Sequence, residues 1–301
     1  MENTHSKYYN DTPEEAFKKF RKDYKIRAAF FIVIIFVLLI GTCVLAIRLQ
    51  KQIIFNPNAP YLYEVSRAAF GLLYMLMLVV IGFLGLKIGM PLVMRPSVQL
   101  INIFMGDCDP VKMYDIYILW EQLAKTERQK NTFLLEKAQC CRYIPERWEE
   151  GMTYLEQVDF KKKQMDWEAS RLFNIAAYAK YRNDRAGFEQ AKADLEQLPN
   201  QFPGIKAQSK QRVHYEKLLQ AITVQELLWD EKDAEARTLL NTLLRTEIFP
   251  LNKVMFHMYL ARLDMKEKAY ENAREHLEYV ITYGNKLPVV PEAKELLDTC
   301  G

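Results

Sequence analysis

The stretch AAFFIVIIFVLLIGTCVLAI, residues 28–47, decides the fold of this chain. It carries no charged side chain, and Thr42 supplies its only hydroxyl. A helix of this length extends about 30 Å, which matches the hydrocarbon thickness of a bilayer. A water-exposed helix would place polar residues along its wet face. The stretch therefore predicts a membrane-spanning helix, with a buried core helix as the alternative.

A second apolar run, AAFGLLYMLMLVVIGFLGL, begins at Ala68. Between the two runs lie Pro57 and Pro60, which interrupt helices. We therefore expect two transmembrane helices, 28–47 and 68–90, joined by a short external loop, 48–67, in which Tyr61 and Tyr63 would be interfacial aromatics. Gly85 and Gly89 form a GxxxG pair, which is either a helix-packing face, used here against the first helix, or an ordinary feature of membrane helices.

Residues 1–27 form a basic amphipathic segment. Residues 1–10 are polar and are expected to be loosely held. Thr12 and Glu15 predict a capping box, and the helix that follows places Phe17, Phe20 and Tyr24 on one face. Six cations surround this face: Lys18, Lys19, Arg21, Lys22, Lys25 and Arg27. This segment is either an ordinary positive flank or a surface that contacts anionic lipid.

The distribution of Lys and Arg predicts the orientation of the hairpin. Six cations lie in residues 18–27, just before the first run, and Lys87 and Arg95 follow the second, whereas the loop carries Arg48, Lys51 and Arg67. The positive-inside rule then predicts that both termini are cytoplasmic. We expect an integral protein of the cell (plasma) membrane. A cleaved signal peptide is the alternative, but the first run is longer than the usual apolar region of such peptides.

Composition limits the class of partner. The net charge is only +3, and residues 95–301 are close to neutral with both signs mixed, which argues against nucleic acid as a partner. The five cysteines show no zinc-binding spacing and are expected to be free thiols in a reducing compartment. These residues are Cys43, Cys108, Cys140, Cys141 and Cys300.

Residues 95–301 read as a cytoplasmic all-helical domain, because apolar residues recur there at spacings of three and four. One pattern recurs in this region. A small residue stands three positions after the first residue of the pattern, and apolar residues stand seven and ten positions after it. It occurs as Trp148-Gly151-Leu155-Val158, Phe188-Ala191-Leu195-Leu198, Asp233-Ala236-Leu240-Leu243 and Tyr270-Ala273-Leu277-Val280. A helix is expected before each, at 131–142, 167–181, 215–229 and 253–265.

This order of residues resembles the tetratricopeptide repeat. The match is best at Ala261, Tyr270, Ala273 and Leu277, and at Ala179, Phe188, Ala191, Leu195 and Pro203. The resemblance covers about 130–300, although the spacing is longer than usual and the family's early aromatic–Leu–Gly signature is absent. It implies an all-α protein in which the membrane hairpin is followed by an α-solenoid of tetratricopeptide-like helix pairs.

The resemblance also implies that a protein or peptide binds in a groove lined by the first helix of each unit. The residues that would line this groove are Phe173, Lys180, Asn183, Met255, Met258, Arg262 and Met265. The methionines are either an adaptable apolar wall or ordinary core residues. The family's clamp for a C-terminal carboxylate is not expected, because only Lys180, Asn183 and Arg262 remotely suit it.

No catalytic motif is recognisable. The chain has no glycine-rich phosphate loop, no GxSxG elbow and no pair of histidines at metalloprotease spacing. We therefore expect no enzyme activity, no cofactor and no metal. The sequence favours a membrane-anchored protein–protein interaction module, a scaffold or adaptor. The alternative is an accessory subunit of a membrane transport or secretion complex that uses the transmembrane hairpin as its contact surface.

Overall fold

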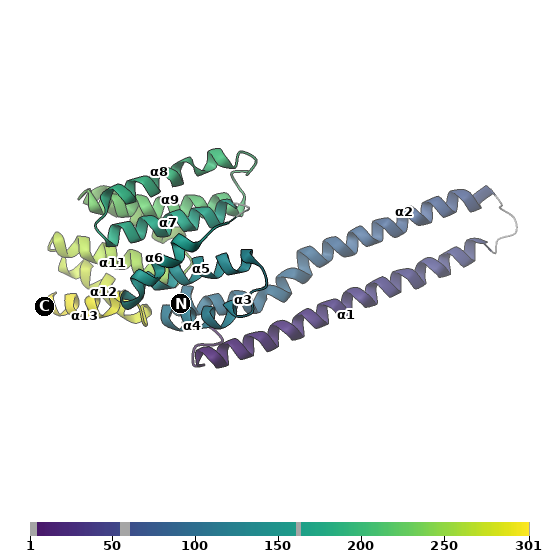
Figure 1. The fold of residues 1–301 in the computed structure, drawn as a ribbon, viewed down its shortest axis with the longest axis horizontal. Coiled ribbons are helices and arrows are strands. Elements are labelled where there is room, and N and C mark those ends of the chain that lie inside the picture. The colour runs from purple at the N-terminus through teal and green to yellow at the C-terminus, as the bar shows by residue number, and fades with distance from the viewer. Residues whose placement is uncertain (1–4, 55–60, 161–163, 301) are drawn as a thin grey trace. The chain divides into compact units, whose positions relative to one another are not determined.

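A computed structural model describes residues 5–54, 61–160 and 164–300 (Figure 1). Over these residues the chain is helical and contains no strand, which confirms the predicted all-α class. It divides into two compact units. The hairpin unit is Lys18–Leu100, and the helical unit combines the residues up to Phe17 with Ile101–Gly301.

The hairpin unit consists of two long apolar helices. Helix α1 is Pro13–Ile54 and α2 is Tyr61–Leu84; a π-helical turn, η1, follows at Gly85–Gly89 and leads into α3, Met90–Met105. By length and composition, Pro13–Arg48 and Tyr74–Met105 could each cross a membrane. Their apolar side chains are mostly exposed, so these helices are not the core of a soluble domain.

The helices of this unit extend further than the sequence predicted. Residues 48–54 and 61–67, expected in the loop, are helical, because only the prolines at 57 and 60 would interrupt a helix there. Residues 55–60, and the side chains of Tyr61 and Tyr63, lie outside the described part of the chain. The second apolar helix also does not end at residue 90, since α3 continues through Pro96 to Met105.

Gly85 and Gly89 pack against the first helix. A Cβ on Gly89 would overlap the ring of Phe31, and one on Gly85 would lie 3.5 Å from Phe31 Cζ. Arg27 also donates from Nη1 to the carbonyl oxygen of Leu92, at 3.4 Å. The glycine pair is therefore used inside the hairpin, at a turn where the backbone departs from α-helical geometry.

We predict that Gly89→Leu separates α1 from η1, because the ring of Phe31 occupies the space of the new side chain. The Cys43 Sγ lies 3.5 Å from the hydroxyl of Tyr74, so in a Tyr74→Cys variant the two thiols are separated by about the length of the removed ring, and a short bifunctional thiol crosslinker can report the approach of α1 and α2. Crosslinking of this variant should fall when Gly89→Leu is added. Gly71→Leu is the control, since nothing lies within 4 Å of that position. Equal crosslinking in both backgrounds would contradict the packing.

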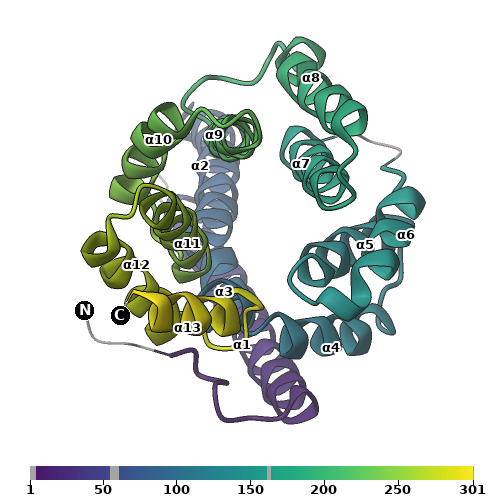
Figure 2. The ribbon, with the colours of Figure 1, turned by 90° about the vertical axis from the view of Figure 1, so that its left-hand side faces the viewer.

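The helical unit is built from helix pairs. Its helices are α4 (Pro110–Glu121), α5 (Glu127–Cys141), the 3-10 turn η2 (Pro145–Arg147), α6 (Trp148–Gln157), α7 (Met165–Tyr181), α8 (Arg185–Gln201), α9 (Lys210–Trp229), α10 (Asp233–Thr246), α11 (Pro250–Lys266), α12 (Tyr270–Tyr283) and α13 (Val289–Thr299). Helices α5/α6, α7/α8, α9/α10 and α11/α12 pack as successive pairs. Figure 2 shows α7, α9 and α11 on the inner side of this unit, with α8, α10 and α12 outside them.

The recurring small residues explain how close the paired helices come. Gly151, Ala191, Ala236 and Ala273 are all buried, and the leucines four positions later, such as Leu195, are at most 4% exposed. A Cβ on Gly151 would lie 2.7 Å from the Cβ of Cys141 in α5, the partner of α6, and would overlap the hydroxyl of Tyr178 in α7. Only small side chains fit between backbones at this distance, which accounts for the small residue at these positions.

Three of the turns between paired helices share one geometry. Asn183, Glu231 and Lys268 each have a positive φ, at 56°, 55° and 61°. The residue after each one donates its N–H to a carbonyl five positions back, as Asp184 does to Ala179 at 2.8 Å. Asn183 was expected in the groove; it lies instead in the turn after α7, where the left-handed conformation ends the helix.

Contacts between residues far apart in sequence join the two ends of the helical unit. The Asn285 Nδ2 donates to the carbonyl oxygen of Asp107 at 2.7 Å, and Lys286 Nζ lies 2.7 Å from the Asp109 carboxylate. The N-terminal residues also bind here, since Ser6 N donates to Asp107 Oδ1 at 2.7 Å and Lys112 Nζ to the carbonyl oxygen of Tyr8 at 2.6 Å. Residues 5–10 are therefore not loose, because their backbone groups bond buried side chains.

Asn285→Ala should destabilise the helical unit. It removes the bond to Asp107 and places alanine at a φ of 45°, a conformation that asparagine tolerates better than alanine. We expect a loss of about 1–3 kcal/mol in unfolding free energy, measured by thermal or denaturant unfolding. Asn200→Ala is the control, because that side chain bonds only the exposed Gln197. Equal stability of the two variants would contradict a role for this contact.

Candidate functional site

Side chains from three inner helices gather on the inside of the helical unit. Two lie at the end of α5, two at the end of α7 and two in α11. We call these residues the inner cluster: Arg142, Tyr143, Lys180, Tyr181, Tyr259 and Arg262. Tyr259 connects the three helices electrostatically, because, after burial, Tyr181 and Tyr143 raise its pKa while Arg262 and Arg142 lower it.

Arg142 is held by neutral partners. Its Nη2 donates to the Tyr143 hydroxyl at 2.7 Å, and its Nη1 donates to Oδ1 of the buried Asn174 at 3.2 Å. The guanidinium lies 4.9 Å from the centre of the Phe173 ring, an arrangement suited to a cation–π interaction. Among the described residues no carboxylate pairs with Arg142, so its charge is only partly compensated.

Lys180 is a second cation without a carboxylate partner among the described residues. Its Nζ donates to the carbonyl oxygen of Gln225 at 2.9 Å. Burial lowers the pKa of Lys180 to about 8, and the nearby charge of Arg262 acts in the same direction. The ammonium is therefore poorly compensated where it lies.

Arg262 is the one cation of the inner cluster that holds a carboxylate. Its Nε and Nη2 donate to the two oxygens of Glu292, at 2.8 and 2.6 Å. Glu292 belongs to the first turn of α13. This bidentate pair shows that a carboxylate fits beside the inner cluster.

The tyrosines of the inner cluster differ in exposure. The side chain of Tyr181 is 44% exposed, whereas Tyr143 is buried and Tyr259 is half-buried. Burial raises the pKa of Tyr181, while Arg142 and Arg262 oppose this shift. Burial likewise raises the pKa of Tyr259 to about 12. Tyr181 is therefore the tyrosine of the inner cluster that offers a surface to a partner.

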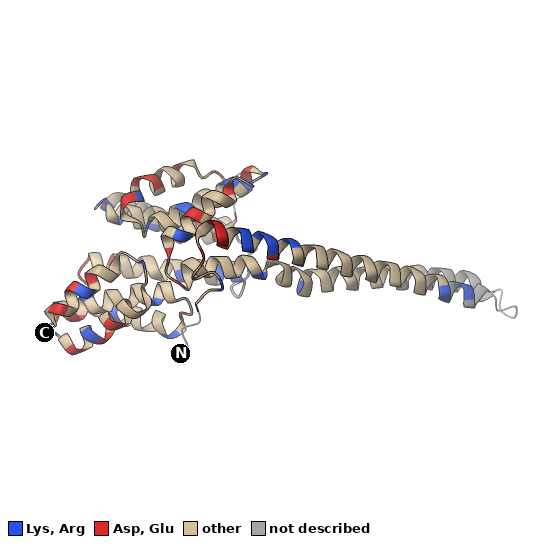
Figure 3. Ribbon diagram, turned by 90° about the horizontal axis from the view of Figure 1, so that it is seen from below, with Lys and Arg blue, Asp and Glu red and all other residues tan. Residues whose placement is uncertain are grey.

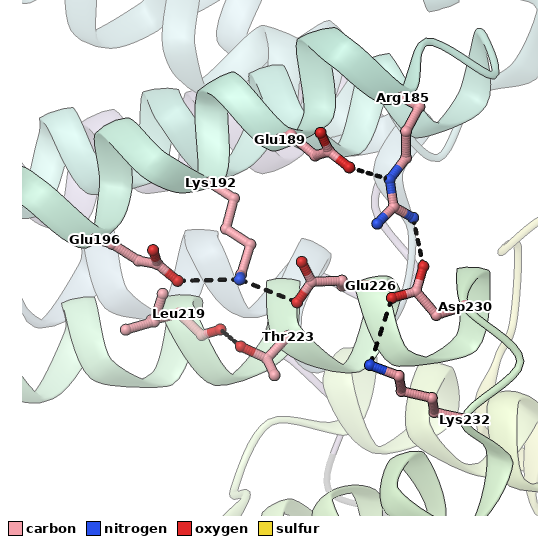
Figure 4. Close-up of polar contacts among 9 residues, drawn as sticks. All are labelled: Arg185, Glu189, Lys192, Glu196, Leu219, Thr223, Glu226, Asp230 and Lys232. Atoms are coloured by element: carbon pink, nitrogen blue, oxygen red, sulfur yellow. Dashed lines mark hydrogen bonds and ion pairs between the residues drawn. The ribbon is translucent and has the colours of Figure 1, made fainter.

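The outside of the same unit is electrostatically different. Figure 4 shows Arg185 between Glu189 and Asp230, at 2.6 and 2.7 Å, and Lys192 between Glu196 and Glu226, at 3.0 Å each. These ion pairs join α8 to α9, and each of these two cations has carboxylate partners. Arg142 and Lys180 differ in this respect from these two cations of α8.

The structure brings together only some of the residues predicted to line a groove. Lys180 and Arg262 belong to the inner cluster, and Phe173 lies under Arg142. Met258 is fully buried, and Met265 accepts a hydrogen bond from the Cys300 thiol at 3.3 Å; Met255 is half-buried. Met258 is therefore a core residue and offers no surface to a partner.

Sequence reasoning missed Arg142, Tyr143, Tyr181 and Tyr259. One signal could have found the first three, because a basic residue followed by tyrosine ends both α5 and α7, as Arg142-Tyr143 and Lys180-Tyr181. Corresponding positions in successive helix pairs point to the same side of the unit. Tyr259 carries no comparable signal, because its approach to Tyr143 depends on the path of the intervening helices.

Other titratable clusters are structural in character. His257 and His276 join α11 to α12 through their Nδ1 atoms at 2.9 Å, and Asp264 pairs with Arg237 at 2.6 Å. Cys140 and Cys141 are buried free thiols whose pKa values are raised by burial. Among the described residues, no group of three or more His, Cys, Asp or Glu side chains is arranged to hold a metal ion.

The histidine pair predicts a dependence of stability on pH. Burial, then the charges of His276 and Lys253, lowers the pKa of His257 to about 4 in the folded chain. Because the ordinary value is about 6.5, the unfolded chain binds more protons between pH 4 and 6.5. The thermal midpoint should therefore fall as the pH drops from 7 to 4. His257→Phe should flatten this dependence; a flat profile for the parent protein would refute the interpretation.

No protein-family model matches this chain, and no characterised protein or solved structure matches it either. The tetratricopeptide resemblance therefore stays a prediction that depends on the helix pairs and their recurring small residues. The function must be inferred from the hairpin unit and the inner cluster.

Proposed function

We propose that this protein is a membrane-anchored interaction module: the hairpin unit spans the cell membrane, and the helical unit binds a partner protein at the cytoplasmic face. The observation that carries the proposal is the inner cluster, in which two cations have no carboxylate partner among the described residues and the exposed ring of Tyr181 lies next to one of them in sequence. Such mixtures of Arg and Tyr are enriched where proteins bind one another.

The hairpin unit supports the membrane location. Phe30, Leu72 and Leu86 are 66%, 74% and 70% exposed, among many other exposed apolar side chains. In water this surface would be far larger than the apolar patches of soluble monomers. Figure 3 shows Lys and Arg gathered near the two ends of α1, with a long stretch between them that has no charged residue.

The charges at those ends support the cytoplasmic placement of the helical unit. Residues 18–27 contribute six cations, as predicted for a cytoplasmic flank in contact with anionic lipid. These six are Lys18, Lys19, Arg21, Lys22, Lys25 and Arg27.

The helix pairs support an α-solenoid. Each pair has a small residue, Gly or Ala, at the corresponding position of its second helix, and three pairs have a left-handed residue in the connecting turn, so the pairs are structurally alike. Stacked pairs of this kind present the first helix of each pair on one continuous surface. In this protein that surface carries the inner cluster, which is where we place the partner.

Photocrosslinking in native membranes tests the location of the partner. A photoreactive phenylalanine analogue is placed at Tyr181 in the inner cluster, or at Tyr270, which is 42% exposed on the outer helix α12. We expect a discrete protein adduct from position 181 and none from position 270. A third position, Leu72, addresses the alternative of an accessory subunit that uses the hairpin. Adducts from Leu72 alone would refute the proposal and favour that alternative.

A further inference from the structure

The inner cluster has unused hydrogen-bond donors on charged groups. An arginine side chain offers five N–H donors and a lysine three. In the described structure Arg142 donates to Asn174 and Tyr143, and Lys180 donates only to Gln225. Both residues therefore keep donors that can point at an incoming acceptor.

The arrangement is electrostatically unfavourable as it stands. Lys180 and Arg262 repel each other, and Glu292 supplies the only carboxylate bonded to the inner cluster among the described residues. Desolvated cations gain most from a negatively charged partner, because water no longer screens the attraction. An anion bound beside Lys180 would raise its pKa again.

The bond between Arg262 and Glu292 indicates the chemistry of the missing partner. Glu292 is a side-chain carboxylate that reaches the cluster from another helix and binds the guanidinium through both oxygens. The remaining donors, on Arg142 and Lys180, suit the same chemistry. Phe173 and Tyr181 lie beside these donors and would cover apolar side chains that flank a carboxylate.

We propose that the inner cluster binds an acidic segment of the partner protein, whose Asp or Glu carboxylates bond Arg142 and Lys180 while neighbouring apolar side chains pack on Phe173 and Tyr181. The proposal rests on the proposed function and narrows it to one class of partner. A peptide fits better than a small inorganic anion, because the aromatic rings would contribute nothing to binding an isolated ion.

The test uses the full-length protein in nanodiscs of zwitterionic lipid. The probe is a fluorescent twelve-residue peptide of alternating Glu and Leu, and its control replaces every Glu with Gln. By fluorescence anisotropy we expect the Glu peptide to bind at least about tenfold more tightly, since a hydrogen bond to a charged group contributes that much or more. Added salt should weaken the binding of the Glu peptide.

Variants locate the peptide on the protein. Lys180→Met should weaken binding of the Glu peptide about tenfold or more, and Lys180→Arg should restore most of it. Lys192→Met removes the same charge from the outer surface and should leave binding unchanged. Lys22→Met checks that the basic segment 18–27 is not the binding site. Weakening by Lys192→Met or Lys22→Met equal to that by Lys180→Met would overturn the proposal.

A measurement on the unmodified protein keeps the proposal testable if a variant fails to fold. At pH 8 an amine whose pKa is about 8 acylates faster than ordinary lysines, so mass spectrometry can follow Lys180 directly. Bound Glu peptide should slow the acylation of Lys180, and the Gln peptide should leave its rate unchanged. Equal protection by inorganic phosphate, or equal binding of both peptides, would overturn this inference. Photoadducts at position 181 would then still support the proposed function, whereas their absence counts against that function.

Discussion

The contact between Asn285 and Asp107, 178 residues apart in sequence, is the constraint on which the helical unit depends. It fixes the turn before α13 against the turn after α3, so the helix pairs cannot continue as an open array. α11 is thereby held near the ends of α5 and α7. The influence of Tyr143 on the pKa of Tyr259 follows from this closure.

Closure also gives the two sides of the helical unit different electrostatics. On the outside, Lys192 pairs with both Glu196 and Glu226. Long side chains of both signs meet there, and their flexibility lets the charged groups reach one another. On the inside, the available volume is shared with large rings, and few carboxylates can approach. Burial and the nearby charge of Arg262 lower the pKa of Lys180 to about 8.

The sequence was informative where structure is determined locally. The apolar stretch 28–47 and the small residues at Gly151 and Ala191 report helix length and helix contact directly, so the long helices and the pairs could be predicted. Three features could not be predicted from the sequence. The binding of residues 5–10, the π-helical turn at 85–89 and the position of Tyr259 all depend on side chains distant in sequence, which periodicity does not reveal.

The chain order has a consequence for how this protein can be divided. The residues up to Phe17 belong to the helical unit, yet the whole hairpin unit separates them from Ile101. A fragment that begins near residue 101 would lose the bonds from Ser6 to Asp107 and from Lys112 to Tyr8, leaving a buried carboxylate and ammonium without these partners. Buried charges in that state are strongly destabilising. The hairpin is therefore an insertion within the helical unit, and the inner cluster has to be studied in the full chain.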